Sequence, residues 1–408
     1  MTRRFCAASA VSLLLMAPAA AHASFSYGTI TYTDIADTFV GSPYKQLVSF
    51  PAINNGGQVA FSPLSQSNIQ SVFVTPTSPG ALITVADTAH GFSGMSSVTL
   101  NNNAVVAFSG TSSTGSNANQ QGVFRGNGGA VTTVADSTTS TLSYYSGGVP
   151  RVSDGGSTVF IGYKTAQEVT IGAAGAFTTV VQYNGSQFEY LFDAAINNGG
   201  QVVFISDDYS TGNNNGAFVY RYTPGSALVK ISRATTSTPV SINDAGVMAF
   251  QAATSTGSSF PDSGVFTSDG TTTTAISQAG QNLPGTSIHI DNYGFNGTPI
   301  NNAGLVAMLA SDNAGSNYGI YVGDGTNTAT IIHVGQILFG KTVQNFSLGR
   351  DAINDNGQLT FNVQFSDNTF AVVRTSGTAA APEPGFALPL FLSALMLPMF
   401  ARTRRRVR

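Results

Sequence analysis

The sequence predicts an all-β protein, a seven-bladed β-propeller placed between two export signals. Three observations lead to this fold class. A nine-residue phrase recurs seven times along the mature chain, at a mean spacing of 50 residues. No stretch between residues 24 and 381 has helical periodicity of useful length. Charged residues make up only 9% of the chain, and small uncharged residues take their place, as in many extracellular β-proteins.

The N-terminus reads as a secretory signal peptide over residues 1–23. It has two arginines near its start, an apolar stretch, and the small residues Ala21 and Ala23 at the cleavage site. Cys6 is the only cysteine and leaves with this peptide, so the mature chain has no thiol for disulfides or thiolate chemistry. We therefore expect signal peptidase to produce a mature protein that begins near Ser24.

The repeat is clearest as Ile-Asn-Asn-Gly-Gly-Gln-Val-Ala-Phe over residues 53–61. Its first polar residue recurs after 47, 52, 44, 46, 58 and 53 residues, and such a period belongs to repeat architectures. The copies of this residue are Asn54, Asn101, Ser153, Asn197, Asn243, Asn301 and Asn354. The structural glycines and aromatics of the repeat are Gly57, Gly200, Gly246, Gly304 and Gly357, with Phe61, Phe108, Phe160, Phe204, Phe250 and Phe361.

Each phrase combines a tight turn with a strand. Asn side chains bond to the local backbone, and glycine adopts the positive φ that residues with a Cβ avoid. In the fourth unit we expect this conformation at Gly199. In the strand, for example residues 59–61, both alternating faces are apolar, which predicts that both sides are covered. The small Ala at its centre lets a neighbouring layer approach.

Further phrases complete each unit. One resembles Gly122-Val123-Phe124, and another, of the form Val85-Ala86-Asp87, precedes each unit. With the apolar stretch before the Asn, every unit offers about four strands. Four-stranded units of about 50 residues whose inner strand is covered on both faces fit propeller blades. We therefore assign residues 24–376 to one seven-bladed domain. A β-helix, with rungs of roughly half this length, and an immunoglobulin-like array, with about 100 residues per domain, fit less well.

Residues 377–408 read as a linker and a sorting tail. The tail contains, in order, the motif Pro382, Glu383 and Pro384, an apolar segment over 385–400, and an arginine-rich end over 401–408. Sixteen mostly apolar residues can just enter a bilayer as a helix, and the arginines behind them stop on the cytoplasmic side. The alternative is a permanent anchor, against which the short span and its internal prolines argue.

The tail resembles the PEP-CTERM sorting signal of Gram-negative bacteria. The repeat resembles the bacterial Asn-x-x-Gly-x-x-Ala-Phe tandem-repeat (choice-of-anchor) family over nearly all of the mature chain, with departures at Ser153 and Met308. The first resemblance implies cleavage near Glu383 by exosortase, a membrane-embedded cysteine protease. Together they imply delivery to the cell surface, the outer membrane or the extracellular matrix of a biofilm. Neither resemblance implies a reaction or a cofactor.

Charge narrows the choice of partners. Between Ser24 and Ala381 there are ten basic and nineteen acidic side chains, a formal charge of −9. Such a balance disfavours binding to nucleic acid or to anionic lipid surfaces. The inner membrane is then a partner only transiently, through the C-terminal helix.

Candidate metal and catalytic residues are few. Oxygen-rich loops near Asp207, Asp208 and Asp312 are the candidates for calcium, although a solvated hairpin loop is the simpler interpretation. The three histidines of the mature chain have no zinc-ligand spacing. The acidic residues that recur with the repeat, Asp37, Asp87 and Asp136, are expected at strand ends or turns. Tyrosines are candidates for carbohydrate contacts, but several lie in expected strands as packing residues. No residue receives a catalytic role.

These observations predict a non-enzymatic propeller that binds or scaffolds at the cell surface, where exopolysaccharide or surface proteins are its partners. The alternative is a surface polysaccharide hydrolase or lyase with its site in the axial channel. Two carboxylates about 5 to 10 Å apart in a pocket would favour the enzyme. Aspartates scattered in turns would favour the binding protein.

Overall fold

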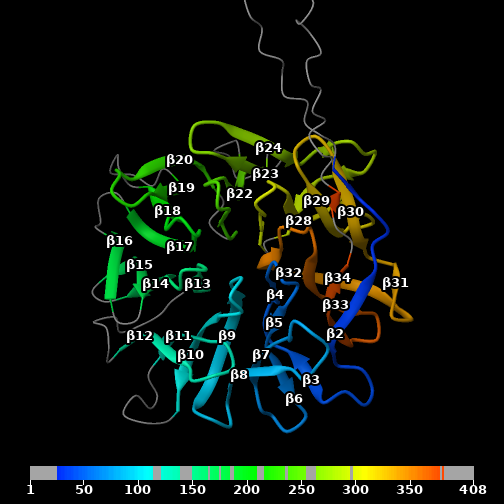
Figure 1. The fold of residues 1–408 in the computed structure, drawn as a ribbon. Helices are drawn as coiled ribbons and strands as arrows, with labels where there is room; N and C mark the ends of the chain where they lie inside the picture. The colour runs from blue at the N-terminus through cyan, green and yellow to red at the C-terminus, as the bar shows by residue number, and fades with distance from the viewer. Residues whose placement is uncertain are drawn as a thin grey trace, which may run out of the picture.

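The computed structural model describes a ring of seven β-sheets around one axis (Figure 1). The described residues are 25–113, 121–137, 149–163, 166–173, 176–183, 188–208, 216–234, 238–253, 263–294, 297–376 and 379–380. Secondary structure within these ranges consists of strands and turns, without an α-helix. Accordingly, the described part contains no helix long and apolar enough to span a membrane. The fold class predicted from the repeat is confirmed.

The first three blades are four-stranded antiparallel sheets whose strands follow the chain from the axis outward. Blade 1 contains β4 (Ala52–Ile53), β5 (Val59–Phe61), β7 (Ser71–Val74) and β8 (Ile83–Asp87). Blade 2 contains β9 (Phe92–Leu100), β10 (Val106–Ser112), β11 (Gln121–Gly126) and β12 (Thr132–Asp136). Blade 3 contains β13 (Arg151–Val152), β14 (Thr158–Tyr163), β15 (Gln167–Ala173) and β16 (Ala176–Gln182).

The next three blades follow the same plan. Blade 4 contains β17 (Phe188–Ile196), β18 (Val202–Asp208), β19 (Ala217–Tyr222) and β20 (Val229–Arg233). Blade 5 contains β21 (Ser241–Ile242), β22 (Met248–Ala253), β23 (Ser263–Ser268) and β24 (Thr273–Gln278). Blade 6 contains β27 (Asn292–Tyr293), β28 (Val306–Ser311), β29 (Gly319–Gly323) and β30 (Thr328–His333).

Blade 7 is assembled from both ends of the chain. Its inner strands are β32 (Lys341–Ile353), β33 (Leu359–Phe365) and β34 (Phe370–Thr375), and its outer strand is β2 (Tyr32–Asp37). In this pairing Ala36 lies opposite Val372. The ring is therefore closed by hydrogen bonds between an N-terminal strand and the last blade.

Short paired strands add to the seven blades. β31 (Ile337–Leu338) extends blade 7, and β1 (Ser26–Tyr27) pairs with β35 (Ala379–Ala380), so the two ends of the domain lie side by side. Two further pairs are β3 (Tyr44–Leu47) with β6 (Pro63–Ser65), and β25 (Gln281–Asn282) with β26 (His289–Ile290).

The position of the Val-Ala-Phe strand differs in one respect from the expectation. We expected it to be the inner strand of each blade, whereas it is the second strand. The innermost strand is the short apolar stretch that precedes the Asn, such as β4 or β21. The expectation of two covered faces is nevertheless confirmed, because Val59, Ala60 and Phe61 are all fully buried.

The two faces of the second strand have different neighbours. Phe61 packs toward blade 7 with Val372, while Ala60 packs toward blade 2 in the cluster that contains Phe108. The same arrangement returns around the ring, where Phe204 joins blade 3 residues and Ala249 joins the cluster of Met308. Phe108 thus shares a cluster with Ala60 of the preceding blade, and Met308 shares one with Ala249. The middle position of this strand is Ala in blades 1, 2, 5 and 6, and it is Val159, Val203 or Thr360 in the other three blades.

Candidate functional site

The candidate site is the axial channel, and the Asn turns form its entrance. In blade 1 the Oδ1 atom of Asn54 accepts a hydrogen bond from the Gln58 backbone N–H (2.9 Å). The Gly57 N–H donates to the Asn54 carbonyl (2.9 Å), which closes the turn. The Asn side chain therefore replaces a backbone partner inside the turn, as the sequence pattern predicts.

The last residue of each turn has positive φ. It is glycine in six blades, at Gly57 (73°), Gly156 (80°), Gly200 (75°), Gly246 (80°), Gly304 (82°) and Gly357 (71°). In blade 2 the same position is Ala104, with φ of 57°. The prediction of positive φ at Gly199 is wrong by one residue, because its neighbour Gly200 closes the turn and donates to the Asn197 carbonyl.

The first residues of the turns form an inner amide ring around the axis. Each Asn Nδ2 donates to the carbonyl of the equivalent residue in the next blade. These bonds run from Asn54 to Asn101 (3.2 Å), Asn101 to Ser153 (2.9 Å), Asn197 to Asn243 (2.9 Å), Asn243 to Asn301 (3.1 Å), Asn301 to Asn354 (3.0 Å) and Asn354 to Asn54 (2.9 Å). The departure at Ser153 interrupts this chain, because its hydroxyl contacts the Ser157 carbonyl of its own turn (3.3 Å).

The residues that follow form a second ring at the mouth of the channel, which we call the rim ring. Its members are Asn55, Asn102, Asp154, Asn198, Asp244, Asn302 and Asp355. In every blade the backbone N–H of this residue donates to the side-chain Oδ1 of its equivalent in the next blade, over 2.7 to 3.0 Å. The rim ring is closed through all seven blades.

Amides and carboxylates alternate in the rim ring. Asp154 Oδ2 accepts from the side-chain amides of Asn102 (3.0 Å) and Asn198 (2.8 Å). Asp244 and Asp355 are likewise held between two amides. Strict alternation is impossible in a ring of seven, and the one pair of like neighbours is Asn55 with Asn102. The ring therefore avoids placing two carboxylates side by side, which would cost electrostatic energy.

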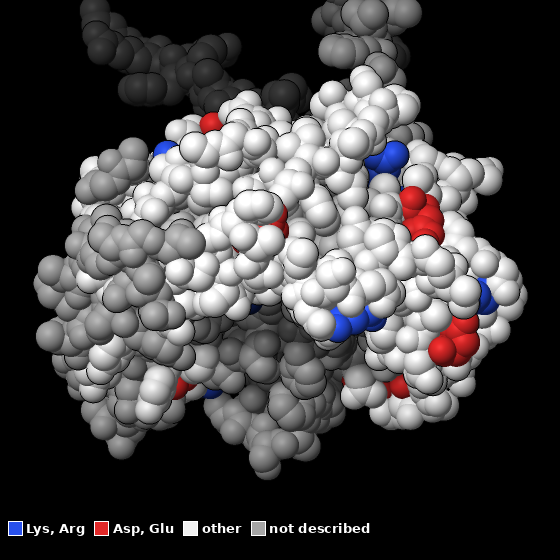
Figure 2. Space-filling model, turned by 90° about the horizontal axis from the view of Figure 1, so that it is seen from below, with Lys and Arg blue, Asp and Glu red and all other residues white. Residues whose placement is uncertain are grey.

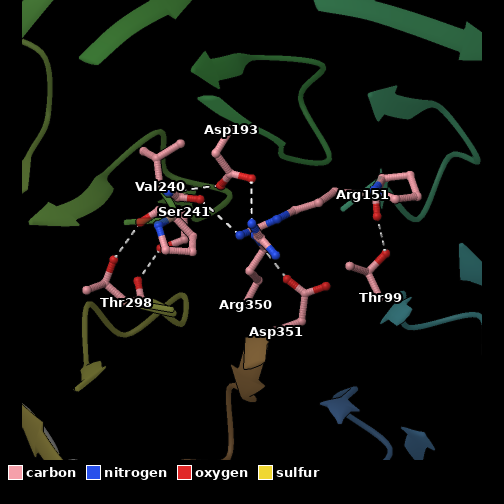
Figure 3. Close-up of polar contacts among 10 residues, drawn as sticks. Thr99, Arg151, Asp193, Val240, Ser241, Thr298, Arg350 and Asp351 are labelled. Atoms are coloured by element: carbon pink, nitrogen blue, oxygen red, sulfur yellow. Dashed lines mark hydrogen bonds and ion pairs between the residues drawn. The ribbon is translucent and has the colours of Figure 1, made fainter. Parts of the chain in front are cut away.

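Deeper in the channel, aliphatic side chains surround the axis before a group of charged residues is reached. The aliphatic positions are Ile53, Leu100, Val152, Ile196, Ile242, Ile300 and Ile353. Beyond them lie Arg151, Asp193, Arg350 and Asp351, whose side chains converge from blades 3, 4 and 7 (Figure 3). We call these four residues the channel ion cluster.

Each charge of the channel ion cluster has an opposite neighbour. Arg350 Nη2 lies 3.0 Å from Asp193 Oδ1, and Arg151 Nη1 lies 3.4 Å from Asp351 Oδ1 (Figure 3). Arg151 Nη2 also donates to the Val240 carbonyl (2.9 Å), while the Val240 N–H donates to Asp193 Oδ2 (3.1 Å). Two cations and two anions give the cluster no formal net charge.

Burial opposes ionisation in this cluster. It lowers the pKa of the Arg151 guanidinium, against the attraction of Asp351 and Asp193. It also raises the pKa of the Asp351 carboxyl, against the attraction of Arg151 and Arg350. A buried pair of this kind contributes little net stability, but removal of one partner leaves an uncompensated charge at a cost of about 3–5 kcal/mol. The cluster therefore ties three blades together.

The free space in the channel is small. The cavity lined by the two rings, the aliphatic residues and Arg151, Arg350 and Asp351 of the cluster has a volume of about 140 Å³. Pockets for drug-sized ligands typically measure about 300–1,000 Å³. The channel accommodates a few water molecules or a very small solute, but a sugar polymer does not pass through it.

The residues predicted as calcium ligands lie in two separate places. Asp208 is buried and pairs with Lys230, and Asp207 is buried beside it. Asp312 accepts from both the backbone and the side-chain amide of Asn317 (3.3 and 3.2 Å). Among the described residues, no group of three His, Cys, Asp or Glu side chains is arranged to hold a metal ion. Residues 209–215 of the first loop lie outside the described ranges.

The recurring aspartates are found where the sequence predicts them. Asp37, Asp87 and Asp136 are the last residues of β2, β8 and β12, the outer strands. Asp37 Oδ1 accepts from the Phe39 backbone N–H (2.7 Å). The processing residues Ala21, Ala23, Pro382, Glu383 and Pro384 lie outside the described ranges, so their roles remain predictions.

Sequence reasoning missed the channel ion cluster entirely. Arg350 and Asp351 are adjacent, but Arg151 lies 200 residues before its partner Asp351, and the four residues belong to no repeated motif. It also missed a carboxyl pair on the outer strand of blade 7, where Asp34 shares a hydrogen bond with Asp37. Burial and this neighbour together raise the pKa of Asp34 to about 7. The pair lies on the perimeter of the ring rather than in the channel.

The surface outside the channel has few charges. Figure 2 shows one side of the molecule, on which the described Lys, Arg, Asp and Glu residues occur as small separate groups among uncharged residues. This distribution agrees with the low content of charged residues, and the described residues on that side form no basic stripe of the kind that tracks a nucleic acid.

Comparisons with known proteins support the fold. A family model described as a family of unknown function (DUF7453) matches residues 234–377, which include blades 5 and 6 and the C-terminal strands of blade 7. A comparison with curated proteins gave no match. The structure is similar to the β-propeller domain of the trilobed protease from Pyrococcus furiosus, with a TM-score of 0.54 and 9% identity over 84% of this chain and 99% of that one.

A second similar structure is an oligogalacturonate lyase in complex with manganese. Its TM-score is 0.50, with 10% identity over 88% of this chain and 98% of that one. Identities this low establish the fold alone. The Pyrococcus furiosus domain has an open velcro topology, whereas in this protein β2 pairs with β34 and closes the ring.

Proposed function

We propose that the protein is an exported, non-enzymatic propeller that binds or scaffolds exopolysaccharide or other components of the cell surface or extracellular matrix. The observation that carries this proposal is that the charged groups of the channel are bound to other groups of the protein. Its rim carboxylates are held by paired amides, and its deeper charges are held in ion pairs. These groups serve to join blades, so binding is assigned to the outer surface of a rigid ring.

The proposal includes a route of export. Signal peptidase removes residues 1–23, and an exosortase cleaves near the motif formed by Pro382, Glu383 and Pro384. The pairing of β1 with β35 supports this part, because the strand Ala379–Ala380, two residues before that motif, is paired with the N-terminal strand of the domain.

Cell fractionation with mass spectrometry tests the route. Peptides from residues 25–376 are expected in the surface or matrix fraction, and peptides from 385–400 are expected only in the inner membrane. Replacing the three motif residues by alanine should retain full-length protein in that membrane, because the hydrophobic segment still partitions into lipid. Recovery of residues 388–400 with the wild-type protein at the surface would mean that the tail is a lasting anchor.

A second candidate function is a polysaccharide hydrolase or lyase that acts in the channel. The observation in its favour is the presence of Asp193 and Asp351 in one cluster, with the pKa of Asp351 raised by burial. A buried carboxyl of raised pKa is the form that a general acid takes. Release of new reducing ends or of unsaturated sugars, lost in Asp351→Asn, would favour this candidate.

A further inference from the structure

We propose that Asn127, in the hairpin between β11 and β12 of blade 2, is a site of spontaneous deamidation, and that the rim ring protects other asparagines of the same sequence context from this reaction. An asparagine followed by glycine is the reactive context, because glycine has no Cβ to hinder attack by its backbone nitrogen. Within the described residues such pairs begin at Asn55, Asn127, Asn198 and Asn356. Three more begin at residues 184, 215 and 296, outside the described ranges.

The reaction consumes only water. The Gly128 backbone nitrogen attacks the side-chain Cγ of Asn127 and loses its proton to solvent, the Cγ–Nδ2 bond breaks, and ammonia leaves. Water then adds to one of the carbonyls of the cyclic succinimide and opens it, which gives aspartate or isoaspartate. The first step requires the Asn side chain to turn back onto the residue that follows it.

Asn127 meets this requirement. It follows β11 directly, and both Asn127 and Gly128 are exposed. Its side chain makes no hydrogen bond to any residue that the structure describes. Its Oδ1 atom lies 3.8 Å from the position that a Cβ on Gly129 would take, so the side chain already leans over the residues that follow it. No hydrogen bond has to be broken before Gly128 attacks.

The fold itself requires the glycine that makes Asn127 reactive. Gly128 has a φ of 101°, a conformation that strains a residue with a Cβ. A Cβ on Gly128 would also collide with the side chain of Ile83 on β8 of blade 1. The hairpin can therefore pack against the neighbouring blade only with glycine at this position, and the Asn-Gly pair is retained.

Asn198 has the same context but a fixed side chain. Its Oδ1 accepts a hydrogen bond from the Asp154 backbone N–H (2.7 Å). Its Nδ2 donates to the carboxylates of Asp154 (2.8 Å) and Asp244 (3.1 Å). Rotation of this side chain toward Gly199 would break these bonds, and hydrogen bonds to charged groups are the stronger kind. The rim ring therefore holds the Asn198 amide away from the nitrogen that would attack it.

Asn55 and Asn356 are held by related contacts. Asn55 Oδ1 accepts from the Asp355 N–H (2.9 Å), and its Nδ2 donates to Asp355 Oδ2 (2.6 Å). Asn356 Nδ2 donates to the Asn55 carbonyl (2.9 Å). The Gly357 N–H, which would have to attack Asn356, donates to the Asn354 carbonyl instead (3.0 Å). The bonds that join the blades thus also protect the asparagines that make them.

Peptide mapping by mass spectrometry tests the proposal within one molecule. The purified folded protein and the same protein in concentrated urea are kept in mildly alkaline buffer, in which the attacking nitrogen loses its proton more readily. Brief digestion with chymotrypsin, which cleaves after Phe and Tyr, places each Asn-Gly pair on a peptide of its own. Deamidation is detected by the mass gained when NH2 becomes OH, and isoaspartate by its separate elution.

In the folded protein we expect the Asn127 peptide to convert at least about tenfold faster than the Asn55 and Asn198 peptides, because loss of one charge-assisted hydrogen bond slows a reaction by about this factor. In urea the three peptides should convert at similar rates. An Asn127 peptide that stays intact in the folded protein, or equal conversion of all three peptides there, would overturn the proposal.

A rim variant tests the protection directly. Asp154→Ala/Asp244→Ala removes both carboxylate acceptors of Asn198, and the control Asp269→Ala removes a carboxylate of the blade 5 hairpin. Thermal unfolding shows whether each variant is folded. The Asn198 peptide should convert at least about tenfold faster in the double variant alone, and the Asn127 peptide at the wild-type rate in both. An unchanged Asn198 rate in a folded double variant would refute protection by the ring. If that variant does not fold, the comparison of folded and urea-treated wild type decides.

Discussion

At the scale of single residues, the Asn turns perform two tasks with two consecutive side chains. The first Asn fixes its own turn through Oδ1 and reaches the next blade through Nδ2, as Asn54 does toward Gln58 and Asn101. The second residue accepts from the backbone of the preceding blade, as Asn102 does from Asn55. One short phrase therefore specifies both a local turn and a contact between blades.

Ala104 is the one residue of the seven turn-closing positions with a Cβ at positive φ (57°). A left-handed conformation costs an L-residue about 1–2 kcal/mol, part of which is offset by the greater entropy of unfolded glycine. Ala104→Gly should therefore raise the free energy of unfolding by up to about 1 kcal/mol, measured by urea denaturation. Gly200→Ala, at the equivalent turn of blade 4, should lower it. A lower free energy of unfolding for Ala104→Gly, or a higher one for Gly200→Ala, would contradict this description of the turns.

The alternation in the rim ring predicts a difference between two identical substitutions. Asn198 donates to carboxylates on both sides, whereas Asn102 has Asp154 on one side and Asn55 on the other. Asn198→Asp should thus destabilise the fold by roughly 1–2 kcal/mol at low salt, and Asn102→Asp by less. Added salt should reduce the difference in stability between the two variants, because both sites are exposed. Equal destabilisation would argue against a role for alternation.

At the scale of elements, the outer strand of blade 7 holds the ring closed and contains an unusual carboxyl pair. Burial first, and then Asp37, raise the pKa of Asp34 to about 7, from 3.8 in an unfolded chain. Between these values the folded protein keeps a proton that the unfolded chain has lost. Stability is therefore lost as pH rises through this window and stays at the lower level above it.

Asp34→Asn replaces the protonated acid with a neutral group of the same shape. Its melting temperature should match that of the wild type near pH 4 and exceed it increasingly up to pH 8. The measurement is thermal unfolding of both proteins across this range, in which all other titrating groups are shared. A difference in melting temperature between the two proteins that stays constant across this pH range would contradict a raised pKa at Asp34.

Several elements follow directly from the sequence. Four strands per unit, the Asn turn and a strand covered on both faces are encoded within about 50 residues and follow from the repeat, although that strand is the second of each blade and not the inner one. The N-terminal phrase Ile35-Ala36-Asp37 even matches the outer strands that end at Asp87 and Asp136. This phrase lies in β2, which pairs with β34. It is therefore the outer strand of blade 7, supplied by the other end of the chain.

At the scale of the whole molecule, the features that the sequence hides are those made by bringing blades together. The cluster of Arg151, Asp193, Arg350 and Asp351, for example, needs side chains from three blades. The two rings link residues 44 to 58 positions apart within the chain, and residues 300 apart where it closes, as between Asn354 and Asn54. The period of the sequence repeat shows that the seven units are alike. Only the folded ring shows which atoms of neighbouring blades are in contact.

The central claim is that this ring binds polysaccharide on its outer surface and leaves the polymer intact. Size-exclusion chromatography with light scattering measures the molar mass of the source organism's polysaccharide before and after prolonged incubation with the purified domain, residues 24–381. We expect the protein to co-elute with the polymer and the molar mass of the recovered polymer to be unchanged. A falling molar mass, abolished by Asp351→Asn in a protein that still folds, would contradict the account and locate an enzyme in the channel.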